Sequence, residues 1–113
     1  RPFGVSLLIA GVDENGPQLW QTDPSGTFTR YEAKAIGAGA EAAQGMFVEQ
    51  YHRSMSLQDA ENLVISILRK VMEDKLTSTN VEVALVRTDT RQLEILGADK
   101  IEAIMARVPV ESE

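Results

Sequence analysis

Residues 16–39 read GPQLWQTDPSGTFTRYEAKAIGAG, and residues 40–51 continue as AEAAQGMFVEQY. Two strand-like runs flank the turn Asp23-Pro24-Ser25-Gly26. In that turn Pro24 presets φ at the first central position, and Gly26 relieves the backbone at the exit. The second run ends in a glycine step, after which apolar residues recur at helical spacing. The stretch therefore predicts a β-hairpin that leads into a helix.

One more strand is predicted upstream, over residues 3–12, which are rich in Val, Leu and Ile as a strand covered on both faces should be. Asn15-Gly16 then signals a hairpin, because these two residues tolerate a positive φ. Residues 17–23 form the second predicted strand and residues 27–36 the third. Together these segments predict a three-stranded antiparallel meander, and antiparallel hairpins exclude a doubly wound sheet.

Two helices are predicted after the meander. The first covers residues 40–54, with apolar positions that step by three and four. These positions are Ala43, Met46, Phe47 and Tyr51. The second helix follows Ser56, whose hydroxyl can cap it, and Asp59 three residues later makes a weak capping box. Its apolar stripe consists of Leu57, Ala60, Val64, Ile67, Leu68, Val71 and Met72.

A second hairpin follows the two helices. After a loop at residues 76–80, residues 81–87 alternate between two faces and pair with residues 92–96 across residues 88–91. A last helix then completes the order of three strands, two helices, two strands and one helix. This order predicts an α+β fold in which antiparallel sheets are layered with helices.

Asp99 is predicted to cap the last helix. The apolar positions of that helix are Ile101, Ile104, Met105 and Val108. Pro109 stops the helix, because proline cannot donate the backbone hydrogen bond that would continue it. The acidic end of the chain, residues 111–113, is expected to fray.

The composition is that of one globular domain and argues against several classes of protein. The chain has 113 residues, of which 43% are hydrophobic and 25% are charged. Its net charge of −6, with basic residues scattered beside acids, argues against a nucleic-acid partner. No apolar run approaches the roughly 20 residues of a membrane span, and no cysteine offers a disulfide or a thiolate ligand. Because Arg1-Pro2 stands directly before a predicted strand, the chain is expected to be a piece of a longer protein.

Residues 37–42, GAGAEA, match the fingerprint of dinucleotide-binding proteins, with Asp59 and Glu61 further along the chain. The context argues against such a site, because a dinucleotide-binding unit needs its helix to return into a parallel strand. Here a second long helix follows instead. We therefore expect no cofactor, and we interpret Gly37 and Gly39 as positions that let the first helix pack closely on the sheet.

His52 is the single histidine and would have to serve in any Ser-His-Asp triad or histidine-based zinc site. It lies near the end of the first predicted helix, beside Arg53, where a solvent-facing side chain is expected. Trp20 and Phe3 lie on predicted strands and are interpreted as core residues. None of these side chains is predicted to be catalytic or to bind a metal.

Neighbouring acidic residues are interpreted as loop polarity rather than as acid–base pairs. Asp13 and Glu14 lie in a predicted turn, and Glu73 and Asp74 lie at a helix end. Residues 89–91 form a hairpin tip. We therefore predict no catalytic residue, no cofactor-binding residue and no metal ligand in the chain.

Segments across nearly the whole chain, to about residue 108, resemble subunits of the proteasome core particle. They are residues 1–44, YHRSMSLQDA at residues 51–60, MEDKL at residues 72–76 and NVEVALV at residues 80–86. The Pro-Ser-Gly turn resembles the alpha type of subunit rather than the proteolytic beta type. Within the alpha type, the segments VDENGPQLW, YHRSMSL and VMEDKL are most similar to the type-5 (zeta) branch.

This resemblance implies an αββα sandwich of the amino-terminal-nucleophile hydrolase kind, of which residues 1–113 would be the carboxy-terminal part of one alpha-subunit domain. The nucleophilic threonine and its lysine belong to the amino-terminal half of that fold, which this chain is expected to lack. Active beta subunits carry a Gly-Ser-Gly-Ser step, where residues 37–40 here read GAGA. Asp74 and Thr77 fall where active subunits have an aspartate and a serine, and this partial match is attributed to the inherited fold.

The function implied by the resemblance is that of a non-catalytic structural subunit of the outer, seven-membered alpha ring. Such a subunit supports assembly, gating and activator docking in ubiquitin-dependent protein degradation, in the cytoplasm and the nucleus. The implied partners are neighbouring alpha and beta subunits, and the tails of regulatory particles or activators that dock on the intact ring. Neither a nucleic acid nor a membrane is expected as a partner.

Two alternatives remain from other functional classes. One is a hydrolase subunit of the threonine-protease, beta-like type, and the other is a stand-alone α+β binding module. The isolated chain is also expected to self-associate, because its strands at residues 3–36 and 81–96 would present unpaired edges and bare apolar faces.

Overall fold

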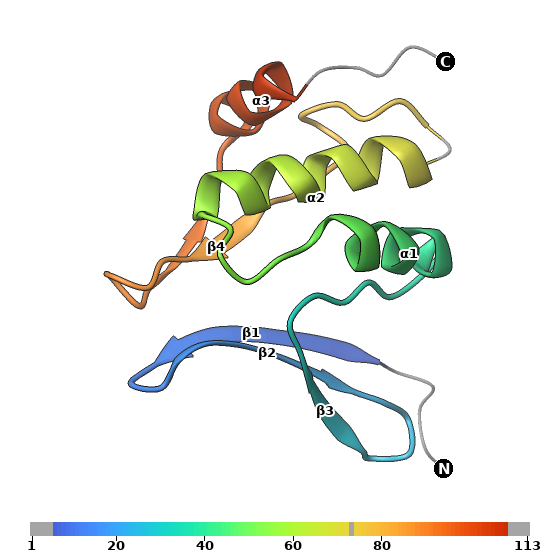
Figure 1. Cartoon of the computed structure of the whole chain (residues 1–113). Helices are drawn as coiled ribbons and strands as arrows, with labels where there is room; N and C mark the ends of the chain where they lie inside the picture. Colours follow the sequence, from blue (N-terminus) through green and yellow to red (C-terminus); the bar gives the residue numbers. More distant parts are fainter. Residues whose placement is uncertain (1–5, 73, 109–113) are drawn as a thin grey trace.

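Strands and helices follow one another along the chain in separate blocks (Figure 1). The computed structural model describes residues 6–72 and 74–108. Within these residues, three strands are followed by two helices, two strands and one helix. The predicted element order and the α+β class with antiparallel sheets are confirmed. The start of the first predicted strand, Pro109 and the acidic residues 111–113 lie outside the described residues.

Strands β1 (Leu7–Asp13), β2 (Gly16–Thr22) and β3 (Phe28–Tyr31) form an antiparallel sheet in the order β1-β2-β3. This is the predicted meander. The loop between β1 and β2 has only two residues, because Asp13 pairs with Gly16. Of the Asn-Gly pair, Gly16 alone uses a positive φ, at 101°. Glycine therefore supplies all of the unusual backbone conformation that the turn needs.

Strand β3 ends at Tyr31, although the alternation predicts a strand as far as residue 36. In the register that pairs Tyr31 with Leu19, Ala33 would lie opposite Pro17. Proline has no N–H to donate to a neighbouring strand, so the ladder of hydrogen bonds cannot continue there. The prediction of a longer strand was wrong because it considered β3 without its partner.

The side chain of Gln44 forms hydrogen bonds with backbone groups of the segment that follows β3. Gln44 lies on helix α1 (Ala40–Gln50). Its Oε1 accepts a hydrogen bond from the N–H of Ala35 at 3.2 Å, and its Nε2 donates to the carbonyl of Ala33 at 3.4 Å. The chain thus leaves the sheet and is held against α1 by one amide side chain.

Helix α1 ends at Gln50 rather than at residue 54, because Tyr51 adopts an extended backbone with φ −79° and ψ 139°. Helix α2 (Leu57–Val71) then runs back along α1 (Figure 1). The predicted capping box of α2 is confirmed. Asp59 N–H donates to Ser56 Oγ at 3.1 Å, and Ser56 N–H donates to Asp59 Oδ2 at 3.4 Å.

Helix α2 buries two of its sides rather than the one stripe predicted. Leu63 and Ile67 pack with Ala43 of α1 in one apolar cluster. Ile65 packs in a second, larger cluster and is only 1% exposed, whereas Val64 of the predicted stripe is 41% exposed. The single-stripe prediction failed because α2 lies between two layers of neighbours, which periodicity within one helix does not reveal.

Strands β4 (Ala84–Val86) and β5 (Leu93–Ile95) form the second antiparallel sheet, and both are shorter than predicted. The N–H of Leu96 also donates to the carbonyl of Val83 at 2.9 Å, so pairing continues just beyond the strands. The predicted alternation is confirmed, since Val83 and Leu85, together with Val81, contact the larger apolar cluster.

Helix α3 (Ala98–Arg107) covers the larger cluster from the other side with Ile101 and Ile104, both 3% exposed. These residues and Val108 are buried as predicted. The prediction that Asp99 caps the helix was wrong, because the helix begins earlier, with Gly97 as its N-cap. Asp99 instead lies in the first turn, where a carboxylate is favourable beside the positive end of the helix dipole.

Candidate functional site

The glycine step before α1 contacts α2 rather than the sheet. Gly39 has φ 79°, and a Cβ placed on it would lie 3.3 Å from Val71 Cβ. These glycines were predicted to let α1 pack closely on the sheet. That prediction was wrong, because the element that Gly39 approaches is α2. Ala38 and Ala40 flank Gly39 on the wall of an apolar cavity of about 250 Å³, together with residues of β1, α1 and α2. These two alanines bring methyl groups to that wall.

His52 is exposed, as predicted, and belongs to a local turn. Its Nδ1 lies 2.9 Å from Ser54 Oγ. The neighbouring Arg53 pairs with the carboxylate of Glu32, the residue that follows β3. The hydrogen bond and the charge of Glu32 raise the pKa of the Arg53 guanidinium above its ordinary value. Among the described residues, the His52 ring thus shares a hydrogen bond with a neighbouring serine and with no carboxylate.

The loop after α2 is held by hydrogen bonds between its own polar groups. Thr77 N–H donates to Asn80 Oδ1 at 2.9 Å, and Asn80 Nδ2 donates to the carbonyl of Lys75 at 2.9 Å. Thr77 Oγ1 lies 2.9 Å from Thr79 Oγ1. In the part of the chain that the structure describes, no hydrogen bond links Thr77 or Asp74 to residues 37–40. Phe3 and Glu73, which were assigned to the core and to a helix end, lie outside that part.

Two acidic side chains of the meander stabilise turns. Asp13 accepts hydrogen bonds from the N–H of Asn15 at 2.8 Å and from Gln18 Nε2 at 3.0 Å. Asp23 accepts from the N–H of Ser25 at 3.0 Å, from the hydroxyl of Ser25, and from the N–H of Thr27 at 3.1 Å. The bond from the Ser25 hydroxyl is the main cause that lowers the pKa of Asp23. Both carboxylates thus have a structural role in loops.

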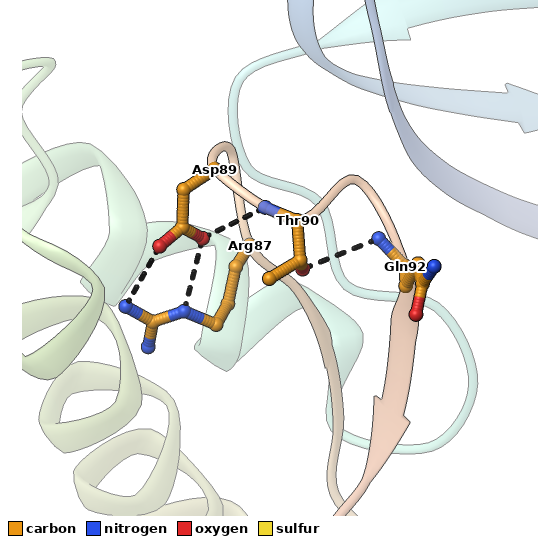
Figure 2. Close-up of polar contacts among 4 residues, drawn as sticks. All are labelled: Arg87, Asp89, Thr90 and Gln92. Carbon is orange, nitrogen blue, oxygen red and sulfur yellow. Dashed lines mark hydrogen bonds and ion pairs between the residues drawn. The ribbon is translucent and has the colours of Figure 1, made fainter.

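The tip of the β4–β5 hairpin is organised by an ion pair (Figure 2). Arg87 Nε donates to Asp89 Oδ1 at 3.1 Å, and the same oxygen accepts from the N–H of Thr90 at 2.8 Å. The hydrogen bond from Arg87 lowers the pKa of Asp89, and in return Asp89 raises the pKa of Arg87. Arg91 completes the tip with a φ of 55°. Both charged side chains are exposed, so the tip has the loop polarity that the sequence predicts.

Residues 6–72 and 74–108 contain neither a metal-binding cluster nor a membrane-spanning helix. Within them, no group of three or more His, Cys, Asp or Glu side chains is arranged to hold a metal ion. No helix in the same residues combines the length and the apolar character needed to cross a bilayer.

A groove of about 730 Å³ was not predicted from the sequence. Its walls are formed by the β1–β2 hairpin, β3 and the residues after α1. Arg30, Glu32 and Arg53 contribute charges, and Tyr31 and Tyr51 contribute rings. Glu32 and Arg53 are 21 residues apart in the sequence, so no local pattern indicates that they meet.

The outer face of the β1–β3 sheet carries a group of exposed apolar side chains beside Thr22 and Arg30. We call Leu7, Ile9, Trp20 and Phe28 the sheet face, because cross-strand pairing and alternation put all four on one side. Leu7 and Ile9 are each 52% exposed, and Phe28 is 67% exposed. The Trp20 and Phe28 rings pack with centroids 5.9 Å apart.

Two predictions were wrong at this sheet face. Trp20 is not a core residue, and β1 is not covered on both faces in this chain. Leu93 and Ile95 of the β4–β5 sheet are exposed as well, at 66% and 73%. Exposed groups of large apolar side chains mark places where a protein binds another element or another chain.

Comparison with known proteins gives a consistent family. The model of the proteasome subunit family matches residues 1–86. The chain is 65% identical over 107 residues to proteasome subunit alpha type-5 of Trypanosoma brucei brucei, a match that covers 95% of this chain and 44% of the relative. It is 56% identical over 89 residues to a probable proteasome subunit alpha type-5 of Schizosaccharomyces pombe, covering 79% of this chain and 36% of the relative.

A third relative, proteasome subunit alpha type-5 of Dictyostelium discoideum, is 44% identical over 105 residues, which are 93% of this chain and 44% of that protein. The chain therefore spans less than half the length of these relatives. The resemblance to alpha-type subunits, and to the type-5 branch among them, is confirmed. Because the family model matches residues 1–86, which are most of this chain, the chain belongs to the proteasome subunit family.

Proposed function

We propose that this chain is the carboxy-terminal part of a non-catalytic alpha-type subunit of the proteasome core particle. The observation that carries the proposal is the 65% identity to a relative named alpha type-5. The residues at the start of α1 agree with it, because Ala38 and Ala40 have methyl groups where the resemblance implies hydroxyls in an active beta subunit. In this proposal residues 1–113 form one domain together with the rest of the subunit.

The role proposed for the intact subunit is structural. Its partners are the neighbouring alpha and beta subunits, and activator or regulatory-particle tails dock on the assembled outer ring. The sheet face and the exposed Leu93 and Ile95 support a role in assembly, since such surfaces are stable when other protein covers them. The place of action is the cytoplasm and the nucleus, and the process is ubiquitin-dependent protein degradation.

The isolated chain is proposed to self-associate. Among the described residues β1 has a strand neighbour on one edge only, since the sheet order is β1-β2-β3. From Leu7 to Val12 this edge carries neither a charge nor a proline, which are the usual means of preventing edge-to-edge pairing. A dimer with a two-fold axis forms either by pairing β1 with β1 or by burying the two sheet faces against each other.

The two alternative functions have less support. A beta-like hydrolase subunit is disfavoured because the three relatives described above are all named as alpha subunits. A stand-alone binding module is disfavoured because the family match extends from residue 1 to residue 86 of the chain.

Hydrolysis of fluorogenic peptides by the purified chain tests the non-catalytic part of the proposal. We expect no turnover at high protein concentration, even after prolonged incubation. Turnover that survives repeated purification and is titrated by a threonine-directed inhibitor would favour the beta-like alternative. A beta subunit with its free amino-terminal threonine serves as the positive control for the substrate and the inhibitor.

A further inference from the structure

We propose that Asn15 is a site of spontaneous covalent modification, at which the asparagine is converted into aspartyl and isoaspartyl forms. The feature that points to this site is the Asn15-Gly16 dipeptide at the exposed tip of the β1–β2 hairpin. The inference does not depend on the proposed assembly role, since it concerns the chemistry of this chain alone.

The reaction needs only water as a co-reactant. The deprotonated backbone nitrogen of Gly16 attacks Cγ of Asn15, the bond between Cγ and the side-chain nitrogen breaks, and ammonia leaves. The product is a five-membered succinimide ring. Water then opens the ring at either carbonyl, which gives an ordinary aspartyl residue or an isoaspartyl residue whose main chain runs through the former side chain. No atom is oxidised or reduced in either step.

The local geometry leaves the Asn15 side chain free beside Gly16, which is the residue that closes the β1–β2 ladder with Asp13. Asn15 is exposed, and its side chain makes no hydrogen bond with the described part of the chain; its backbone N–H donates to Asp13 Oδ1 at 2.8 Å. Gly16 has no side chain to shield its nitrogen, and apart from Gly16 and its two chain neighbours no described residue has an atom within 4 Å of the position where a Cβ would be. The amide of Asn15 is thus free to rotate toward the Gly16 nitrogen.

The other two asparagines of the chain provide internal controls. Asn80 is held by two hydrogen bonds, to Thr77 N and to the carbonyl of Lys75, and the β-branched Val81 follows it. Asn62 lies inside α2 with its Oδ1 buried, and Leu63 follows it. Both asparagines therefore have a restrained amide and a following residue with a Cβ, and Asn15 has neither.

The modification would change the hairpin in two ways. It adds a negative charge beside Asp13 and Glu14, on the rim of the groove that contains Arg30 and Arg53. In the isoaspartyl form the main chain is also one atom longer within a two-residue loop, whose short length fixes the β1–β2 register. We therefore expect modified molecules to exchange the backbone amides of β1 and β2 faster than unmodified ones.

Incubation of the whole chain at neutral and mildly alkaline pH, followed by peptide mapping with mass spectrometry, tests the proposal. Isoaspartyl groups are counted by methyl transfer from S-adenosylmethionine with an isoaspartyl methyltransferase. We expect Asn15 to convert first, at a rate that rises with pH as the Gly16 nitrogen loses its proton more readily. Conversion at Asn15 that is no faster than at Asn80 would overturn the proposal.

The variant Asn15→Gln is the matched control. It keeps an amide on the loop, but its extra methylene would require a six-membered ring, which closes much more slowly. The expected result is loss of most of the methyl-acceptor signal with an unchanged thermal midpoint. A signal that persists undiminished in Asn15→Gln would assign the isoaspartyl groups to another residue and contradict the proposed site.

Discussion

Oε1 of Gln44, on α1, accepts a hydrogen bond from the backbone N–H of Ala35 at 3.2 Å. This contact joins the end of the meander to the helical layer, at the point where Pro17 prevents β3 from continuing. One side chain thus connects two parts of the fold that share no strand pairing. Its loss would leave a partly buried backbone N–H without its partner.

We therefore expect Gln44→Ala to lower the free energy of unfolding by about 1–3 kcal/mol, the usual cost of an unsatisfied group of this kind. Denaturant titration followed by circular dichroism measures the change. Gln50→Ala, at the exposed end of the same helix, is the control and should stay within about 0.5 kcal/mol of the parent chain. Equal effects for the two variants would show that the Gln44 contact contributes nothing.

Two adjacent residues of α2 test its two-sided burial. Ile65→Ala removes a side chain that is 1% exposed, and such changes typically cost about 2–5 kcal/mol. Val64→Ala, one position earlier, removes a side chain that is 41% exposed and should cost much less. Thermal unfolding of both variants gives the comparison. A larger loss for Val64→Ala would restore the single-stripe interpretation of this helix.

Two glycines should respond to alanine in opposite directions. Gly39→Ala places a Cβ 3.3 Å from Val71 Cβ on a backbone with φ 79°, so it should destabilise the chain by about 1 kcal/mol or more. Gly45→Ala lies inside α1 with no atom within 4 Å of the new Cβ, so it should stabilise the chain by up to about 1 kcal/mol. Thermal midpoints measured side by side test the pair, and a stabilising Gly39→Ala would contradict the close approach.

The pH dependence of stability should depend in part on Asp23. The hydrogen bond from the Ser25 hydroxyl lowers the pKa of Asp23 in the folded chain. A carboxyl with a lowered folded pKa stabilises the fold above its unfolded pKa, and this contribution is lost as the pH falls through the folded value. Asp23→Asn should therefore lower the thermal midpoint at neutral pH, and the two proteins should converge in acid. A gap that stays constant down to acid pH would show that the charge of Asp23 has no such effect.

The sequence predicts those features that depend on neighbouring residues. The Ser56–Asp59 capping box and the Asp23–Gly26 turn follow from side chains within four positions of one another. The element order follows from hydrophobic periodicity, because each period reflects local backbone geometry. These predictions needed no knowledge of the tertiary structure.

The features that the sequence does not predict depend on distant partners. The early end of β3 requires knowledge that Pro17 would lie opposite Ala33, and the two-sided burial of α2 requires α1 and α3 to be in place. The Glu32–Arg53 pair joins segments 21 residues apart. At the candidate interaction surface, the expectation that a partial fold leaves apolar faces bare agrees with the exposed Leu7, Ile9 and Phe28, whereas the local sequence does not tell which face of β1 is covered.

Self-association through the sheet face can be tested with one charge. Phe28→Glu introduces a carboxylate at a position that is 67% exposed, so the fold should tolerate it while two apposed faces should not. Light scattering over a dilution series should show a larger species for the parent chain and a smaller one for the variant. Val48→Glu is the control, since Val48 is even more exposed, at 78%, but lies on α1. A parent chain that remains monomeric at micromolar concentration would contradict the proposed self-association.

The most direct test of the assembly role is incorporation into an alpha ring. The chain is mixed with the other alpha subunits of Trypanosoma brucei brucei. The part of that organism's alpha type-5 subunit that this chain does not match is added as a separate polypeptide. Native mass spectrometry then measures the composition of the particles. The account predicts rings that contain one copy of this chain in the type-5 position and that fail to form when it is omitted. Rings that assemble equally well without the chain, or that exclude it, would contradict the account.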